Sequence, residues 1–191
     1  MRVFTVQPPT VMRQIQEQGV VYSVFHKAIP QQRHWHDFKR PYQFIYQNYG
    51  QRKHYTFGWD QGLFWAYDRF DYFSEGYYRA MAANRASRYL LTLDIPDETC
   101  LAFNSSAWNS CLNHGNLLQR HEQKPEGYDW ALMFAPNAVQ IMAADYRLFY
   151  PEDAAESDET LVGTVREVVF PYIRAKWVQK AKHFRGKRSL L

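Results

Sequence analysis

Histidine is the residue type whose spacing in this sequence first suggests chemistry. His34 and His36 flank a tryptophan, and His114 and His121 lie seven residues apart, a spacing of two helical turns. Imidazole is a common metal ligand, but each of these histidines would need a carboxylate or another histidine brought close by the fold. We therefore expect no metal site, and we interpret these histidines, together with His54, as exposed or capping residues.

The two cysteines, Cys100 and Cys111, suggest a thiol nucleophile with His114 or His121 as its base. Catalytic pairs meet in space rather than along the sequence, so their proximity is weak support, and cysteine is among the most buried residue types. Two cysteines are also too few for a disulfide framework. No apolar run follows the basic start, and none approaches about 20 residues, so we expect a cytoplasmic protein that does not enter a membrane.

Basic side chains are concentrated near the C-terminus. The 191-residue chain has 23 Lys and Arg against 19 Asp and Glu, a net charge of +4, and its last 24 residues hold seven basic and no acidic side chains. Such a run can bind a phosphate backbone, so we predict contacts with RNA or DNA. The predicted contact residues are Lys180, Lys182, Arg185, Lys187 and Arg188. The alternative is a solvated helix face whose cations favour the C-terminal end of the helix dipole.

Composition and missing motifs exclude several classes of protein. Aromatic residues make up 17% of the chain, and 17 of them lie between Trp35 and Tyr78, whereas Gly and Pro together number only 18. Collagen-like, linker-like and disordered chains are excluded. The sequence has no glycine-rich dinucleotide fingerprint, phosphate loop, paired-cysteine zinc site, zincin motif or nucleophile elbow. The common enzyme classes that carry these motifs therefore lose their usual support.

Local patterns predict strands and helices without regular βαβ alternation. Predicted strands cover 2–6, 20–23, 55–67, 89–95, 100–103 and 139–142. Predicted helices run from Pro8 and Pro9 to Gly19, over 37–49, over 74–85, from a cap at Ser105 or Ser106 to Gly115, and over 164–177. We expect 89–95 and 100–103 to form a hairpin. The prediction is a single α+β domain over 1–191, with a mixed or split antiparallel sheet flanked by helices and a basic helix and tail at 164–191.

Several segments, in this order along most of the chain, resemble an uncharacterised bacterial and phage family, a domain of unknown function. The residues that carry the resemblance are Phe4, Thr5, Val6, Gln7, Pro8, Phe64, Trp65, Ala66, Tyr67, the run 90–96, Trp108, Leu112, Asn113, Tyr172, Ile173, Trp177, Val178 and Phe184. The sequence departs from the family pattern at Asn104, Ser105 and Ser106, which stand where acidic residues are usual. A role for carboxylates at that place is therefore in doubt.

The N-terminal order of a strand, a helix, Gly19 and a second strand also resembles the entry of ADP-ribosyltransferase folds, whose first strand carries an Arg or His that holds NAD. The resemblance implies an ADP-ribosyltransferase-like fold that clamps NAD in a split sheet, with an aromatic side chain against the nicotinamide. The residues that it assigns to the clamp, with Arg2 as the cation, are Arg2, Thr5, Tyr22, Trp65 and Tyr67.

The same chemistry requires a carboxylate that stabilises an oxocarbenium-like centre as nicotinamide leaves. Gln140 stands where we would look for a glutamate, which leaves Glu122, Glu126 and Glu152 as unplaced candidates. We assign the catalytic role to Glu152, together with Arg2 and Thr5.

These patterns lead to two hypotheses of different classes. The first is an NAD-dependent ADP-ribosyltransferase-like protein that uses NAD as a substrate and no metal, a toxin or phage-defence protein that modifies nucleic acid. The alternative is a non-enzymatic module of a phage–host conflict system that binds nucleic acid or protein. Expected partners are RNA or DNA, or a cognate antitoxin or a phage or host protein. Because fold-level analogy does not establish activity, the site itself has to support either hypothesis.

Overall fold

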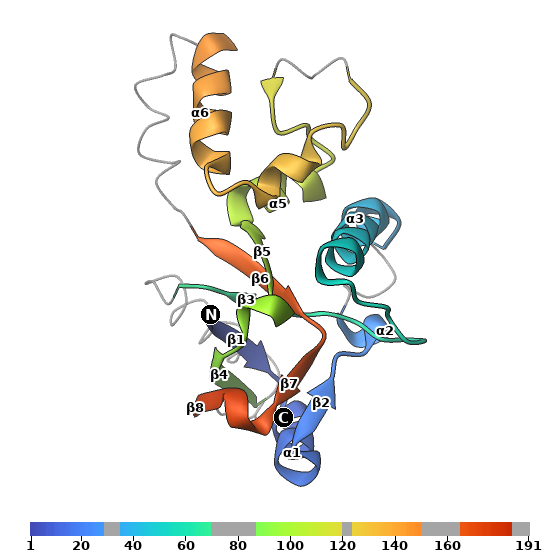
Figure 1. The fold of residues 1–191 in the computed structure, drawn as a ribbon, viewed down its shortest axis with the longest axis vertical. Coiled ribbons are helices and arrows are strands. Elements are labelled where there is room, and N and C mark those ends of the chain that lie inside the picture. Colours follow the sequence, from blue (N-terminus) through green and yellow to red (C-terminus); the bar gives the residue numbers. More distant parts are fainter. Residues whose placement is uncertain (29–34, 70–86, 120–123, 150–164, 185–191) are drawn as a thin grey trace, which may run out of the picture. The chain divides into compact units, whose positions relative to one another are not determined.

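The computed structural model describes residues 1–28, 35–69, 87–119, 124–149 and 165–184. The chain forms two compact units. Unit 1 comprises Met1–Gln31, Tyr49–Leu101 and Val168–Leu191, and unit 2 comprises Gln32–Asn48 and Ala102–Glu167. The α+β class and the mostly antiparallel sheet confirm the prediction at that level (Figure 1). Within the described residues, no helix has the length and apolar character to cross a membrane.

A six-stranded sheet holds the strands in the order β5-β6-β3-β1-β4-β8 (Figure 1). Its strands are β1 (Arg2–Gln7), β3 (Phe64–Tyr67), β4 (Arg88–Asp94), β5 (Leu101–Asn104), β6 (Arg166–Phe170) and β8 (Val178–Phe184). β1 pairs antiparallel with both β3 and β4. The predicted hairpin of 89–95 with 100–103 is wrong, because β4 pairs with β1 and β8, whereas β5 is the edge strand beside β6.

In unit 1, β1 leads into α1 (Pro9–Gln18), and Gly19 connects α1 to β2 (Val20–Tyr22). A proline at the first helical position and a glycine after the last favour a helix with these ends. Gly19 has a φ of 73°, and its N–H donates to the carbonyl of Ile15 at 3.0 Å. These local signals confirm the predictions for 2–6, for the helix after Pro8 and for 20–23. The prediction for 55–67 holds only over β3.

Further along unit 1, β2 pairs antiparallel with β7 (Tyr172–Arg174) in a separate two-stranded sheet. The short helical segments of this unit are α2 (Phe25–Ala28), η1 (Asp97–Thr99) and η5 (Ala175–Trp177). Val3 of β1 and Leu91 and Leu93 of β4 are fully buried, and Ile15 of α1 is 2% exposed. The core of unit 1 therefore contains side chains from one face of the sheet and from the apolar face of α1. This core fixes the position of the residues around α1.

The C-terminal segment is built of strands, so the predicted helix over 164–177 and the basic helix within 164–191 are wrong. Residues 166–184 form β6, β7, η5 and β8. Val168, Val169 and Ile173 are β-branched and fully buried, which suits strands, and Pro171 has no N–H for a helix interior. The cross-strand partners of β8 lie in β4, far away in the sequence. The predicted helix over 74–85 lies outside the described residues.

Unit 2 contains α5 (Ser105–Leu112), η3 (Trp130–Phe134) and α6 (Ala138–Phe149), and α3 (Trp35–Lys53) runs from unit 2 into unit 1. Asn104, rather than Ser105 or Ser106, caps α5, since its Oδ1 accepts the N–H of Ala107 at 2.8 Å. The predicted strand at 139–142 is wrong because these residues belong to α6. A short apolar run has the same pattern in a buried helix and in a strand, so the pattern alone could not distinguish them.

Candidate functional site

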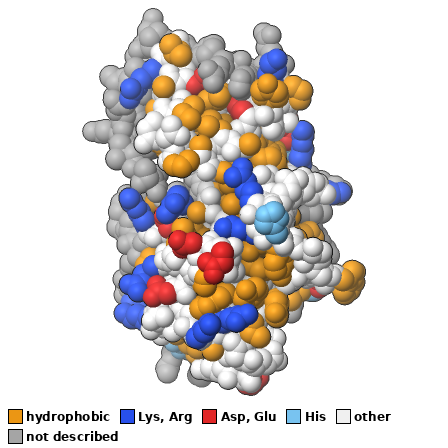
Figure 2. Space-filling view, viewed as in Figure 1, with side chains coloured by type: hydrophobic (Ala, Val, Ile, Leu, Met, Phe, Trp, Pro, Cys, Tyr) orange, Lys and Arg blue, Asp and Glu red, His pale blue; other side chains and the backbone are white. Residues whose placement is uncertain are grey.

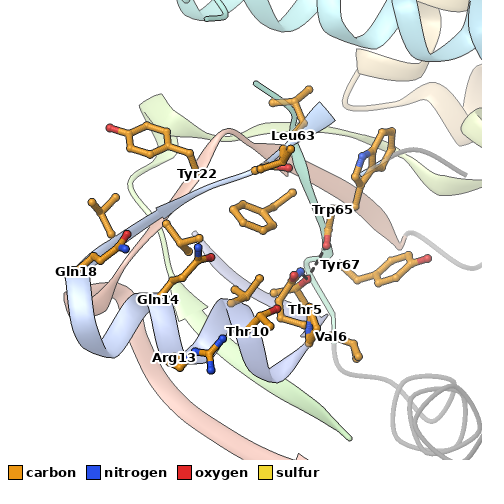
Figure 3. A pocket seen from close by; sticks show the side chains of 18 residues that line it. Thr5, Val6, Thr10, Arg13, Gln14, Gln18, Tyr22, Leu63, Trp65 and Tyr67 are labelled. Atoms are coloured by element: carbon orange, nitrogen blue, oxygen red, sulfur yellow. Dashed lines mark hydrogen bonds between the residues drawn. The ribbon is translucent and has the colours of Figure 1, made fainter. Parts of the chain in front are cut away.

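Unit 1 contains a pocket of about 910 Å³ between α1, β2, the end of β1 and β3. This volume is within the range of about 300–1,000 Å³ that is typical of ligand pockets. Figure 3 shows its walls. The residues that line it are Thr5, Val6, Gln7, Pro8, Thr10, Val11, Arg13, Gln14, Gln18, Val20, Val21, Tyr22, Ser23, Val24, Leu63, Phe64, Trp65 and Tyr67. Four of the five residues assigned to the NAD clamp thus meet at one pocket: Thr5, Tyr22, Trp65 and Tyr67.

Thr5 lies in the middle of β1 and is only 2% exposed. Its hydroxyl donates a hydrogen bond to the carbonyl of Trp65 at 2.7 Å and accepts one from Nε2 of Gln7 at 2.8 Å. The bond to Trp65 ties β1 to β3 on the floor of the pocket, whereas the bond from Gln7 lies within β1. The Thr5 hydroxyl therefore has a structural role, and it orients the Gln7 amide beside it.

The rings of Trp65 and Tyr67 lie on the other side of the sheet from Thr5. Phe4 is directly opposite Tyr67, and successive side chains of a strand point to opposite faces, so the Tyr67 ring shares the face of Phe4 rather than that of Thr5. Figure 3 shows both rings directed away from α1. Trp65 and Tyr67 therefore border the pocket from the outer side of β3, and neither ring faces α1 across it.

Arg2 is not among the residues that line the pocket. Its Nε and Nη2 donate to the two oxygens of the Asp94 carboxylate, each at 2.8 Å, across the β1–β4 pair. The hydrogen bond with Asp94 raises the pKa of Arg2, and the same bond lowers the pKa of Asp94. Because both side chains are well exposed, water screens this pair, and its contribution to stability is small.

Arg13 of α1 lines the pocket, in contrast to Arg2. Among the described residues, it is the one charged side chain that lines the pocket, and no acidic side chain lines it. Gln14 and Gln18 follow on the same helix, and Figure 3 shows the Gln14 side chain extending from α1 toward the space beneath Leu63. The positions 10, 13, 14 and 18 share one face of a helix, so the polar face of α1 was the signal that could have identified these residues.

A loop that precedes β3 is hydrogen-bonded to the chain that follows β2. The N–H of Gly62 donates to the carbonyl of Ser23, and the N–H of Phe25 donates to the carbonyl of Asp60, both at 2.8 Å. Asp60 also accepts hydrogen bonds from Nδ1 of His26 at 2.8 and 2.9 Å. The loop is thereby attached to the chain directly after β2, which includes the pocket residues Ser23 and Val24.

Gly62→Ala should destabilise the protein by about 1–3 kcal/mol, the usual cost of overpacking. A Cβ at this position would lie 2.9 Å from the backbone nitrogen and 3.0 Å from the Cα of Phe25, and neither atom can rotate away. The matched control is Gly58→Ala in the same loop, whose Cβ would meet only Gln61 Oε1 at 3.5 Å. Urea denaturation of the two variants checks the difference, and equal stabilities would contradict the close approach.

Unit 2 contains a buried acid that sequence analysis missed. Glu167 in β6 is 8% exposed, and its Oε1 accepts a hydrogen bond from the hydroxyl of Ser105 at 3.0 Å. Burial raises the pKa of Glu167 to about 7, although the Ser105 hydrogen bond acts in the opposite direction. The sequence analysis missed Glu167 because it predicted a helix over 164–177, whereas Glu167 lies in strand β6. Ser105, one of the residues at which the sequence departs from the family pattern, is its hydrogen-bond partner.

The other candidates for chemistry are accounted for within the described residues. Burial raises the pKa of Cys100 to about 12 and also raises the pKa of Cys111, and buried thiols of this kind are inert as nucleophiles. Nδ1 of His114 lies 2.7 Å from the Glu126 carboxylate, and His54 is exposed. No three His, Cys, Asp or Glu side chains of the described part could together hold a metal ion.

The predicted nucleic-acid residues divide into two groups. Lys180 and Lys182 are exposed on β8, an edge strand of the six-stranded sheet, instead of on a helix. Alternation along the strand places both on the same face. The predicted residues Arg185, Lys187 and Arg188 lie outside the described residues, as do the predicted catalytic residue Glu152 and the histidines His34 and His121.

Comparison with known proteins gives one family. A family described as a domain of unknown function (DUF3841) matches residues 2–156, a span that includes every residue lining the pocket. No curated protein and no solved structure matches the chain. The match confirms the resemblance that the sequence suggested to an uncharacterised family. The chain belongs to this family, the domain of unknown function DUF3841.

Proposed function

We propose that the pocket of unit 1 binds NAD and that the protein is an ADP-ribosyltransferase-like enzyme, a toxin or phage-defence protein that modifies nucleic acid. The observation that carries the proposal is the pocket of unit 1 that Thr5, Tyr22 and Arg13 line together. Trp65 and Tyr67 border this pocket from the outer side of β3. The resemblance to ADP-ribosyltransferase folds assigns Thr5, Tyr22, Trp65 and Tyr67 to an NAD clamp.

The chemical character of the pocket supports an anionic, aromatic ligand. The guanidinium of Arg13 can form charge-assisted hydrogen bonds with the diphosphate of NAD, and no acidic side chain opposes it among the described lining residues. The amides of Gln7, Gln14 and Gln18 offer donors and acceptors for the ribose hydroxyls and the carboxamide. Tyr22 is 53% exposed at the rim and gives the pocket an aromatic border.

In the proposed reaction, the bond between nicotinamide and ribose C1′ breaks, and nicotinamide leaves with the bonding electron pair. A nucleophilic atom of the acceptor then bonds to C1′ and loses a proton, so ADP-ribosylated acceptor, nicotinamide and H⁺ are formed from NAD and acceptor. A carboxylate near C1′ stabilises the positive charge of the transition state. The sequence assigns this role to Glu152, which lies outside the described residues. The Thr5 hydroxyl ties β1 to β3 on the floor of the pocket.

The test is NAD binding and nicotinamide release by the purified protein, alone and with RNA, DNA or cell lysate. Arg13→Gln should weaken NAD binding about tenfold or more, because a charge-assisted hydrogen bond contributes about 1.5–3 kcal/mol. Arg2→Gln is the matched control, since Arg2 pairs with Asp94 and does not line the pocket. Absence of both an NAD-induced shift in Tm and nicotinamide release would refute the proposal, and equal losses in the two variants would refute the role of Arg13.

The second candidate is the non-enzymatic module that binds nucleic acid. The observation that favours it is the basic edge strand β8, which exposes Lys180 and Lys182 with no acidic residue along it. Such a strand can contact phosphates without any role for the pocket. Salt-dependent binding of nucleic acid that disappears in Lys180→Gln/Lys182→Gln, together with no nicotinamide release, would favour this candidate over the first.

A further inference from the structure

The outward face of the β2–β7 pair is the surface from which we infer a further site. Tyr22 is directly opposite Tyr172, and Val21 is directly opposite Ile173. Val21 and Ile173 are 5% and 0% exposed, so they point into the core. Because side chains alternate along a strand, Tyr22, Tyr172 and Arg174 share the opposite, outward face. This face, named here the Tyr22–Arg174 face, lies wholly within unit 1.

The side chains on this face form a continuous stack. The rings of Tyr172 and Trp177 are nearly parallel, at 26°, with centroids 5.2 Å apart. The Arg174 guanidinium lies 5.4 Å from the centroid of the Tyr172 ring and 6.0 Å from that of the Trp177 ring. Tyr22 packs against Tyr172 at 5.5 Å in a tilted arrangement, and it remains 53% exposed. The stack therefore holds Arg174 in place and ends in a largely exposed ring.

Tyr22 also lines the pocket, so the stack begins at the pocket rim and leads away from it. The charge along this path is positive. Neither β2 nor β7 contains an acidic residue, and exposed Lys176 follows Arg174. Figure 2 shows basic side chains beside hydrophobic ones on the lower part of the face that it draws. A preorganised cation beside an exposed aromatic ring is the combination with which proteins bind single-stranded nucleic acid.

We propose that the Tyr22–Arg174 face is a subsite for single-stranded nucleic acid, with one base stacked on Tyr22 and the adjoining phosphates bound by Arg174 and Lys176. The proposal deepens the proposed function and rests on it in one respect: the bound strand is the acceptor that presents a base nitrogen to ribose C1′. Unpaired bases are required because the ring of Tyr22 can stack only on a base that has left the duplex. The strand itself binds whether or not NAD is present.

The experiment measures binding of fluorescein-labelled oligothymidylate and oligouridylate, and of a duplex of the same length, by anisotropy over a range of salt concentrations and without NAD. Tyr22→Ala should weaken binding of the single strands about tenfold, and Tyr22→Phe should retain it because the ring stays. Arg174→Gln should weaken binding and should reduce the slope of log K against log salt by about 0.7, the loss of one phosphate contact to a single strand.

Unit 2 provides a matched control. Tyr128 is 60% exposed, and Nζ of Lys124 lies 5.6 Å from the centroid of its ring, so this pair in the other unit has the same chemistry. Tyr128→Ala and Lys124→Gln should bind oligonucleotide as the unmodified protein does. The comparison of thymidylate with uridylate distinguishes DNA from RNA as the source of the strand.

Three results would overturn the subsite: no binding of either oligonucleotide, duplex binding as tight as single-strand binding, or equal losses in Tyr22→Ala and Tyr128→Ala. Nicotinamide release is measured separately on the unmodified protein with each oligonucleotide. Binding that depends on Tyr22 without any release would support the subsite and overturn the transferase. Release that the oligonucleotides stimulate, with the stimulation lost in Arg174→Gln, would support both.

Discussion

The effect of Glu167→Gln on the free energy of unfolding should be about 3 kcal/mol more favourable at about pH 8 than near pH 4. The free energy of unfolding of the variant should therefore depend less on pH between these two values. Glu167 is nearly buried, and burial raises the pKa of its carboxyl to about 7. In an unfolded chain, the pKa of a glutamate is about 4.3. The native state therefore keeps a proton that the unfolded state loses between these two values.

The sign of the effect follows from the number of bound protons. Below about pH 4.3, Glu167 is protonated in both the folded and the unfolded state, so its ionisation does not lower the free energy of unfolding. As the pH rises toward 7, only the unfolded state releases the proton, so the free energy of unfolding falls. Above about pH 7 the native carboxylate is ionised too, and the loss levels off. Glutamine stays neutral throughout, and its carbonyl oxygen can still accept a hydrogen bond from the Ser105 hydroxyl.

Urea denaturation at a series of pH values measures this difference. Glu98→Gln, at an exposed position in η1, is the control and should follow the curve of the unmodified protein. The difference between pH values is the decisive quantity, because any packing cost of the amide is the same at both ends of the range. Parallel curves for Glu167→Gln and the unmodified protein would show that the carboxyl does not stay protonated in the folded state.

The second large effect is expected for Asp129→Ala, which should lower the free energy of unfolding by about 2–5 kcal/mol. The Asp129 carboxylate accepts the backbone N–H of Leu117 at 2.9 Å and that of Leu118 at 2.7 Å. Both leucines are 4% exposed and Asp129 is 8% exposed, so water cannot replace the lost acceptors easily. Each buried donor left without a partner costs about 1–3 kcal/mol.

Asp129→Asn keeps one acceptor oxygen and should lose about half as much stability as Asp129→Ala. Asp97→Ala is the control for removal of an exposed carboxylate, since the Asp97 side chain is 81% exposed and forms a surface pair with the N-terminal amine. Its expected change is within about 1 kcal/mol. A loss in Asp129→Ala no larger than that in Asp97→Ala, measured by urea denaturation, would contradict the role of the two hydrogen bonds.

Elements with signals in their own residues could be predicted from the sequence. Pro9 and Gly19 mark the ends of α1, and β-branched and aromatic residues identify β1 and β4. The family resemblance was also readable from the sequence. Four of the residues that the separate resemblance to ADP-ribosyltransferase folds assigned to a clamp are among those that line the pocket. In each case, neighbouring residues carry the information, because caps and propensities act within a few positions.

Three features of the candidate site depended on pairing between distant segments. The antiparallel register of β1 with β3 places the Thr5 side chain and the Tyr67 ring on opposite faces. Pairing of β1 with β4 brings Arg2 to Asp94, away from the pocket, and leaves Arg13 as its cation. Pairing of β2 with β7 brings Tyr22 to Tyr172 and Arg174. A shift of one residue in any of these registers would send the side chains to the other face.

The C-terminal segment shows most clearly what tertiary structure decided. Its apolar residues fit a helical spacing, yet β8 pairs with β4, and Glu167 is buried in β6. Sequence alone determined the ends of α1, the central strands and the positive charge of this segment. Only the tertiary structure decided which strands pair, which faces their side chains take and which acid is buried. A helix satisfies its backbone hydrogen bonds within itself, whereas a strand needs a partner that can lie far along the chain.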